Sequence, residues 1–382
     1  MAHGGSGGGA LVPVPLGSTA GGRSRALGAV VVGVTAALGA LAGWAIDRRW
    51  LSDDGDEAAG DAGRTLPDSD EHVVVTDDGA ELATTVIRPE GAWRSRFRRR
   101  RTQPATVVLV HGWTNTRAVW GPVARQLLAA GHPVIAYDQR GHGASTFGPE
   151  APTVQRLGQD LAAVLEQLDV RHAVLVGHSM GGFTIMAWAI DHHDDLHKRA
   201  RGLALAGTAA HGLGFGSLDQ LASKVVGGRT VDWLLARPRL GLLLMRGAVG
   251  RHPRRRDLSV TRELFLATQP AVRAACYLLC TQMDLRAGLP SIDVPTVVLS
   301  GGRDSVTPAR LGRTIADTIP GARFELLPDA GHLIILEETD RVVAAVLRMA
   351  GDDAGDDEGA EDDDTSEGAD PADEVSARSG AD

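Results

Sequence analysis

The chain has only two cysteines in 382 residues, Cys276 and Cys280, which lie four positions apart in a helical pattern. This scarcity excludes a disulfide framework, and we expect two reduced thiols that pack against neighbouring side chains. The sequence also lacks a glycine-rich phosphate-binding loop and any recognisable nucleic-acid-binding motif. Nucleotide-dependent chemistry and nucleic-acid binding therefore have no support in the sequence.

Both ends of the chain lack the apolar patterning of a packed domain. Residues 1–25 are rich in Gly, Ser, Ala and Pro, and we expect them to be disordered. Residues 351–382 hold fourteen acidic side chains, one arginine and no aromatic residue, so they cannot bury enough surface to offset the entropy of ordering. This acidic tail accounts for more than the whole net charge of −9, and the acidic balance therefore says nothing about a substrate.

Residues 26–46 form an uncharged run with two arginines close on each side. At 1.5 Å per residue, a helix of this length would span the hydrocarbon core of a membrane. We expect a single-pass anchor; the alternative is a signal peptide cut near Ala40-Leu41-Ala42, which would release a secreted protein. The symmetric arginines leave the orientation open.

Residues 94–101 contain six arginines between two expected strands. We expect a solvated loop there. The alternative is attraction to anionic lipid headgroups or to the acidic tail.

Between residues 71 and 350, after a linker over residues 47–70, short apolar stretches alternate with helical patterns. The turn signal Asp77-Asp78-Gly79 predicts a hairpin of residues 72–75 and 82–86. Such alternation predicts an α/β fold, with a mostly parallel eight-stranded sheet covered by helices on both faces. The six further strands are expected at 105–110, 133–137, 173–176, 202–206, 296–300 and 324–327, and helices at 117–130, 154–168 and 308–318.

The alternation stops between residues 207 and 290, where a leucine-rich stretch has only helical patterns. This stretch arrives between two core strands, so we expect it to lie over the strand ends as a helical cap. A cap can be purely structural, but apolar side chains above a reactive group would also form a pocket for an acyl or aromatic group.

The string Gly177-His178-Ser179-Met180-Gly181 follows the expected strand 173–176 directly. A strand that turns sharply into a helix presents its serine hydroxyl at the helix N-terminus, as a nucleophile. The backbone crowds at such a turn, so only glycine fits two positions before and after the serine. In a chain with 48 glycines, the string alone is equally compatible with an ordinary turn.

A serine nucleophile needs a base, and the base needs a carboxylate that holds its tautomer. His332 and Asp304 each lie in a loop just beyond an expected strand. Asp329 is closer to His332 in sequence, but it is better placed to brace the turn, and we therefore prefer Asp304. The order Ser179, Asp304, His332 is the one expected for this sheet architecture.

On these residues, and on the string Asp138-Gln139-Arg140-Gly141-His142-Gly143, the chain resembles the α/β-hydrolase family over about residues 71–350. The resemblance implies an oxyanion hole made by the backbone N–H groups of Met180 and Trp113. It gives Asp138 and Arg140 a structural role. The arginine-rich insertion and the membrane segment depart from the compact family pattern.

Two histidines near these motifs have other expected roles. His111 should shape the oxyanion loop, and His178 should be a packed side chain that points away from the nucleophile. His193 and His197 have the i, i+4 spacing of a helical metal pair, but at the polar end of a helix we expect a solvated terminus and no metal.

The resemblance implies a serine hydrolase that cleaves carboxylic esters without a cofactor, and a cap beside a membrane anchor favours lipid-like or apolar acyl esters. Serine at position 179 argues against the family's dehalogenases and epoxide hydrolases, which use aspartate there. Carbon–carbon bond hydrolysis and cofactor-free perhydrolase or haloperoxidase-like chemistry share the triad and stay open. The expected partners are a small-molecule ester and a membrane; the rival hypothesis is a non-catalytic ligand-binding module.

Overall fold

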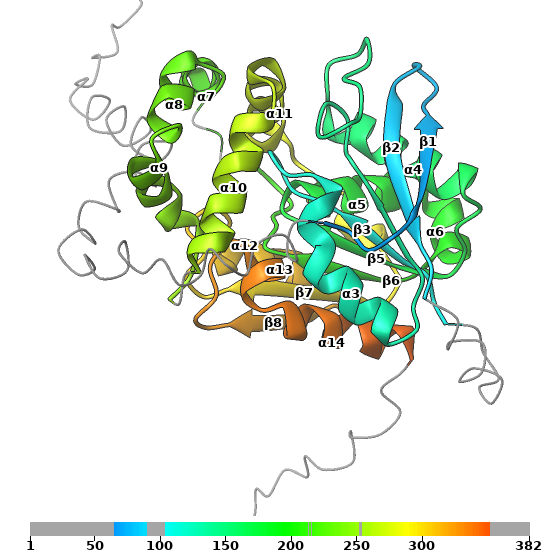
Figure 1. Ribbon diagram of the computed structural model, residues 1–382. Helices are drawn as coiled ribbons and strands as arrows, with labels where there is room; N and C mark the ends of the chain where they lie inside the picture. Colours follow the sequence, from blue (N-terminus) through cyan, green and yellow to red (C-terminus); the bar gives the residue numbers. More distant parts are fainter. Residues whose placement is uncertain (1–64, 90–103, 213, 215, 252–253, 352–382) are drawn as a thin grey trace, which may run out of the picture.

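The computed structural model describes residues 65–89, 104–212, 214, 216–251 and 254–351 (Figure 1). In this part of the chain, one sheet has eight strands in the order β1-β2-β4-β3-β5-β6-β7-β8. β2 is antiparallel to both β1 and β4, and the other neighbours are parallel, which confirms the expected mostly parallel sheet. The strands are β1 (Asp70–Val75), β2 (Glu81–Ile87), β3 (Val107–Val110), β4 (Val134–Tyr137), β5 (Ala173–His178), β6 (Ala200–Ala206), β7 (Thr296–Gly301) and β8 (Arg323–Leu327).

Helices cover both faces of the sheet because the central strands are apolar at every position. In β3, Val108 and Val110 belong to a core shared with α4 (Val154–Gln167), α5 (Met180–Asp191) and α12 (Ala309–Thr318). Val107 and Leu109 point into a second core with α3 (Gly121–Ala129) and α14 (Thr339–Ala350), which lie side by side in Figure 1. Shorter helical segments complete the layers: η4 (Arg117–Trp120), α6 (His193–Arg199), η7 (Leu289–Ser291) and α13 (Ile334–Glu337).

The chain between β6 and β7 is helical and forms a separate group at the upper left of Figure 1. We name this group, α7 to α11, the helical insertion. Its α11 carries both cysteines as free thiols, and burial raises the pKa of Cys276 to about 12. Its members are η5 (Gly216–Leu218), α7 (Asp219–Val226), α8 (Arg229–Leu235), α9 (Pro238–Met245), η6 (Arg246–Ala248), α10 (Arg255–Ala267) and α11 (Pro270–Gln282).

A buried ionic network fixes the loop that follows β4. The fully buried guanidinium of Arg140 donates to both carboxylate oxygens of Asp160, at 2.6 and 2.9 Å, and of Asp78, at 2.7 and 3.0 Å. Asp138 accepts hydrogen bonds from the backbone N–H groups of Arg117, at 2.7 Å, and Ala144, at 3.0 Å. These contacts agree with the structural role expected for Asp138 and Arg140.

Several sequence predictions lie outside the described residues: the N-terminus 1–25, the anchor 26–46, most of the linker, the arginine stretch 94–101 and the tail beyond Gly351. Among the described residues, no single helix has the length and apolarity needed to cross a membrane. One pair, α10 and α11, meets that test of length and composition together, but is bent by 107°.

Candidate active site

Ser179 lies at the sharp turn between β5 and α5, with φ +53° and ψ −117°. A non-glycine residue with positive φ is strained and persists only where its surroundings enforce it. A Cβ on Gly177 would lie 2.6 Å from the carbonyl oxygen of Gly181, and a Cβ on Gly181 would lie 2.0 Å from that of Val110. The two glycines flanking the serine are therefore required by backbone contacts.

The loops after β7 and β8 bring Asp304 and His332 to this serine. His332 Nε2 lies 3.1 Å from Ser179 Oγ, and His332 Nδ1 lies 2.9 Å from Asp304 Oδ2. All three residues lie just beyond the carboxyl ends of parallel strands, β5, β7 and β8, as expected from the sequence. The distances allow His332 to accept the serine proton at Nε2 while its Nδ1–H donates to the carboxylate.

Asp304 is buried, and both of its carboxylate oxygens are used. Oδ1 accepts the backbone N–H groups of Val306 and Thr307, each at 2.8 Å, and Oδ2 accepts the Thr307 hydroxyl at 2.6 Å beside His332. Burial alone would raise the pKa of Asp304, but the charge of His332 and these hydrogen bonds hold that pKa below its ordinary value. The carboxylate is thus ionised and fixed in orientation.

The backbone around His332 forms hydrogen bonds with the helical insertion, with His178 and with Glu337. His332 N–H donates to the carbonyl of Ala248 at 2.8 Å, and the His332 carbonyl accepts from His178 Nε2 at 2.7 Å. The carboxylate of Glu337 accepts the N–H groups of Gly331 and Leu333, both at 3.1 Å, on either side of the histidine. Glu337 also accepts the N–H of Gly250 at 2.6 Å, which joins the segment between η6 and α10 of the helical insertion to the histidine loop.

His178 is the packed side chain that the sequence predicted. Burial, followed by the charge of nearby His332, lowers the pKa of His178 to about 3, so the ring is neutral. Because the His332 carbonyl can only accept, Nε2 of His178 must carry the proton. His178 therefore connects the nucleophile turn to the backbone of His332.

The loop after β3 carries Trp113 and runs beside the turn of Ser179, where a Cβ on the preceding Gly112 would lie 3.2 Å from Ser179 Cβ. Met180 is the first residue of α5, so its N–H has no partner within the helix. In the described part of the chain, the N–H of Trp113 has no backbone hydrogen-bond partner either. Both groups are thus free to donate to an oxyanion.

His111 braces this loop. Its Nε2 accepts the N–H of Gln139 at 2.9 Å, while the side chain of Gln139 donates to the His111 carbonyl and accepts from Thr184. Burial lowers the pKa of His111 to about 4. The next turn of the loop is held by His142, whose Nε2 accepts the N–H of Thr114 at 3.2 Å; burial lowers the pKa of His142 to about 3. We call His111, His142 and His178 the low-pKa histidines.

The helical insertion contacts the same loop through aromatic rings. The ring of Trp113 meets Phe265 of α10 edge to face, with centroids 6.0 Å apart, and Tyr277 of α11 at 6.1 Å. Aromatic side chains of the helical insertion therefore pack against the Trp113 ring, in the loop that follows β3.

Asp329, the alternative acid, lies elsewhere. Its carboxylate is half exposed and forms ion pairs of 3.6 Å with Arg251 and Arg303. The described contacts of His332 include Asp304 and not Asp329, in agreement with the preference stated from the sequence.

Sequence reasoning missed Thr307 and Glu337, and it did not foresee the hydrogen bond from His178 to the His332 carbonyl. Glu337 follows the histidine by five residues and lies in α13, a helix of four residues that carries no periodic signal. A glutamate five residues after His332 was the available clue. The backbone contacts of Glu337 could be known only from the folded chain.

A serine, a histidine and an aspartate at the carboxyl ends of β5, β8 and β7 define a serine hydrolase with the α/β-hydrolase fold. Residues 101–339 match the family described as serine aminopeptidase, S33. The chain belongs to this family and is an enzyme of the serine hydrolase class.

Individual relatives differ in the activity that their names state. Several curated proteins are 30% identical to this chain over 246 to 258 residues. One of them is the pimeloyl-[acyl-carrier protein] methyl ester esterase of Chromobacterium violaceum, and the alignment with it covers 64% of this chain and 93% of the esterase. Non-heme chloroperoxidase CPO-A1 of Kitasatospora aureofaciens is 26% identical over 63% of this chain and 89% of its own length. The enol-lactonase of Burkholderia xenovorans aligns with a TM-score of 0.60 at 26% identity, covering 73% of this chain and all of the lactonase.

Proposed function

We propose that this enzyme hydrolyses carboxylic esters by a Ser179–His332–Asp304 triad. Ser179 Oγ attacks the ester carbonyl while His332 Nε2 takes its proton, and the N–H groups of Trp113 and Met180 donate to the oxyanion. His332 then gives the proton to the leaving alcohol, which leaves an acyl group on Ser179. Water attacks the acyl group by the same relay and restores the serine.

The observation that carries this proposal is the continuous chain of contacts from Ser179 Oγ through both ring nitrogens of His332 to a fixed carboxylate, at 3.1 and 2.9 Å. A purely structural serine at a strained turn needs no base behind it. A non-catalytic binding module likewise has no use for an ionised acid that orients this base. No step of the proposed mechanism requires a cofactor.

We infer that the acyl part of the substrate is apolar. The aromatic rings of Phe265 and Tyr277 lie on Trp113, whose backbone amide is proposed to bind the oxyanion. A substrate whose carbonyl reaches this amide would extend its acyl chain along those rings. Lipid-like esters suit such a surface better than charged ones.

A panel of p-nitrophenyl esters with acyl chains of two to twelve carbons tests both parts of the proposal. We expect kcat/KM to rise with chain length, and Ser179→Ala to abolish turnover of every ester. Ser291→Ala, an exposed serine on η7, is the matched control and should retain the wild-type rate. Hydrolysis that survives Ser179→Ala would refute the nucleophile, while preference for the two-carbon ester would refute the apolar acyl group. An aminoacyl p-nitroanilide added to the panel tests peptidase activity, which the family's name suggests.

A second activity is favoured by the chloroperoxidase relative. Hydrogen peroxide in place of water would release the acyl group from Ser179 as a peracid, which needs no metal or cofactor. Peracid formation from acetate and hydrogen peroxide, measured by bromide oxidation, separates the two activities. We expect hydrolysis to exceed perhydrolysis; the reverse ratio would identify a perhydrolase.

We further propose that residues 26–46 anchor the enzyme in a membrane as a single helix, on the basis of their length and lack of charge alone. Extraction of membranes with alkaline carbonate should leave the full chain in the pellet. A soluble product that begins near Gly43 would show a cleaved signal peptide instead.

A further inference from the structure

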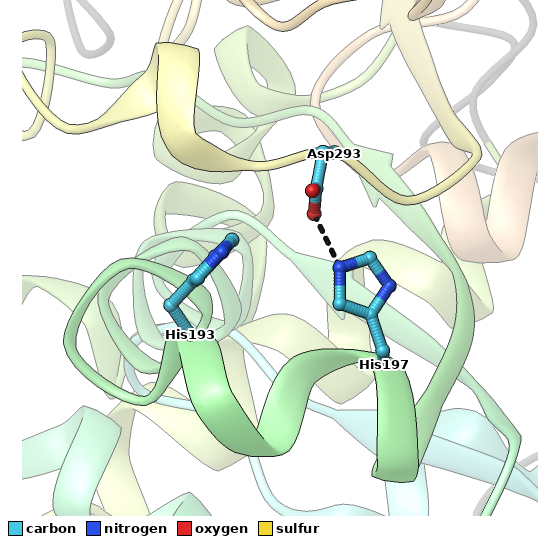
Figure 2. Close-up of side chains that lie close together, drawn as sticks. All are labelled: His193, His197 and Asp293. Atoms are coloured by element: carbon cyan, nitrogen blue, oxygen red, sulfur yellow. Dashed lines mark ion pairs between the residues drawn. The ribbon is translucent and has the colours of Figure 1, made fainter.

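A cluster of three metal-ligating side chains lies on the surface, well away from the triad. His193 and His197 come from α6, and Asp293 comes from the segment that leads into β7. Figure 2 shows the two imidazole rings rising from the same side of α6 toward the Asp293 carboxylate. Asp293 is distant from the histidines in sequence, and only the pairing of β6 with β7 brings it beside them.

The ligand atoms have the spacing of a metal site. One atom of each residue can be chosen so that all three lie within 4.8 Å of one another, and His197 Nε2 is 3.0 Å from Asp293 Oδ1. Around a tetrahedral ion with bonds of about 2.1 Å, ligand atoms are separated by about 3.4 Å. Since all three side chains are exposed, small rotations about their side-chain bonds suffice to reach this separation.

We propose that His193, His197 and Asp293 bind a divalent transition-metal ion such as Zn²⁺. Two imidazoles and one carboxylate suit zinc, nickel or copper, whereas Mg²⁺ and Ca²⁺ prefer oxygen ligands. In the metal-free protein, His197 shares a proton with Asp293 through Nε2. On binding, the Nε2 proton is released to solvent, the neutral ring carries a proton taken from solvent on Nδ1, and the Nε2 lone pair binds the metal. The remaining coordination positions are open to water.

The place of the site in the fold makes its role structural. His197 and Asp293 lie near the amino ends of β6 and β7, whereas Ser179, Asp304 and His332 lie at carboxyl ends of the sheet. A strand of six residues separates the two edges by about 20 Å. A metal ion there would link α6 to the approach of β7 and stabilise the sheet without touching a substrate. This inference does not depend on the proposed ester hydrolysis.

The test measures Zn²⁺ binding to the full, tag-free chain after treatment with a chelator and its removal. A chromophoric indicator gives the dissociation constant of wild type and of His193→Ala, His197→Ala and Asp293→Ala. His72→Ala, an exposed histidine on β1, is the matched control for non-specific surface binding. We expect each cluster substitution to weaken binding at least about ten-fold and the control to leave it unchanged.

Two further readouts separate a built site from loosely bound ions. Co²⁺ should give the visible absorption bands of a tetrahedral site in wild type, and these bands should disappear in His193→Ala. Zn²⁺, but not Mg²⁺, should raise the thermal midpoint of wild type, while the cluster variants keep the metal-free midpoint and lose the increase. Equal Zn²⁺ affinity in wild type and all three variants would overturn the site. A hydrolysis rate that requires Zn²⁺ would overturn its structural role.

Discussion

Replacing Asp304 by asparagine exchanges one carboxylate oxygen of the proposed triad for an NH₂ group. The surrounding hydrogen bonds determine which of the two oxygens is exchanged. Oδ1 accepts two backbone N–H groups at 2.8 Å, from Val306 and Thr307. In Asp304→Asn the amide oxygen must stay on this side, because an NH₂ group there would face two donors. The NH₂ group therefore takes the position of Oδ2, 2.9 Å from Nδ1 of His332.

An NH₂ group at this position donates to Nδ1 and so moves the ring proton of His332 to Nε2. Nε2 then donates to Ser179 Oγ and can no longer accept its proton. We expect kcat to fall by about 10³- to 10⁴-fold, equivalent to about 4 to 5.5 kcal/mol of activation free energy, with little change in KM. Because the shape of the side chain is kept, urea unfolding should show a folded protein.

The assay is ester hydrolysis under saturating substrate, with Asp329→Asn as the matched control. Asp329 is half exposed and pairs with arginines only at 3.6 Å, so its substitution should change kcat less than about two-fold. Wild-type turnover in Asp304→Asn, or a large loss in Asp329→Asn, would refute the assignment of the acid.

Three further predictions concern the support of this site. Glu337→Gln places an NH₂ group against backbone N–H donors of the His332 loop. We expect this variant to lose about 1 to 3 kcal/mol of unfolding free energy and to have a lower kcat. An unchanged urea midpoint would contradict this prediction. Arg140→Met leaves the buried Asp160 with its ion pair to Arg156 at 3.3 Å but without the two hydrogen bonds from Arg140, and should cost about 3 kcal/mol of unfolding free energy. Arg286→Met, which breaks an exposed pair, should leave the urea midpoint almost unchanged, and equal losses in the two variants would contradict the network. The low-pKa histidines stay neutral in the fold, while the unfolded chain takes up their protons below pH 6.5. Stability should therefore fall as pH decreases from 6.5 to about 4, by up to about 4 kcal/mol per pH unit, and a flat urea midpoint between pH 7 and 5 would contradict it.

The sequence allowed all eight strands to be placed within about two residues, because the central strands are short apolar runs bounded by turn signals. Among the parallel strands, β8 fits the expectation of a sheet covered on both faces least well. β8 lies at one edge of the sheet, where Arg323 and Leu326 are exposed and Phe324 and Glu325 are only partly buried. Edge position depends on strand order, which periodicity does not reveal.

The proximity of Ser179, Asp304 and His332 could be predicted because each follows a strand, and the carboxyl ends of parallel strands meet at one edge of the sheet. The residues that hold the triad could not be predicted in this way. Glu337 and His178 act on backbone groups of the His332 loop, and such contacts leave no pattern in the sequence. Asp293 meets His197 for a similar reason, since their proximity arises from strand pairing alone.

The central claim is that Ser179 is an activated nucleophile, and covalent labelling with a fluorophosphonate tests it most directly. The intact mass of the folded enzyme should increase by a single adduct, and peptide mapping should locate that adduct on Ser179. Ser179→Ala should remain unlabelled under the same conditions. Absence of labelling in folded wild type, or an adduct on another residue, would contradict the account.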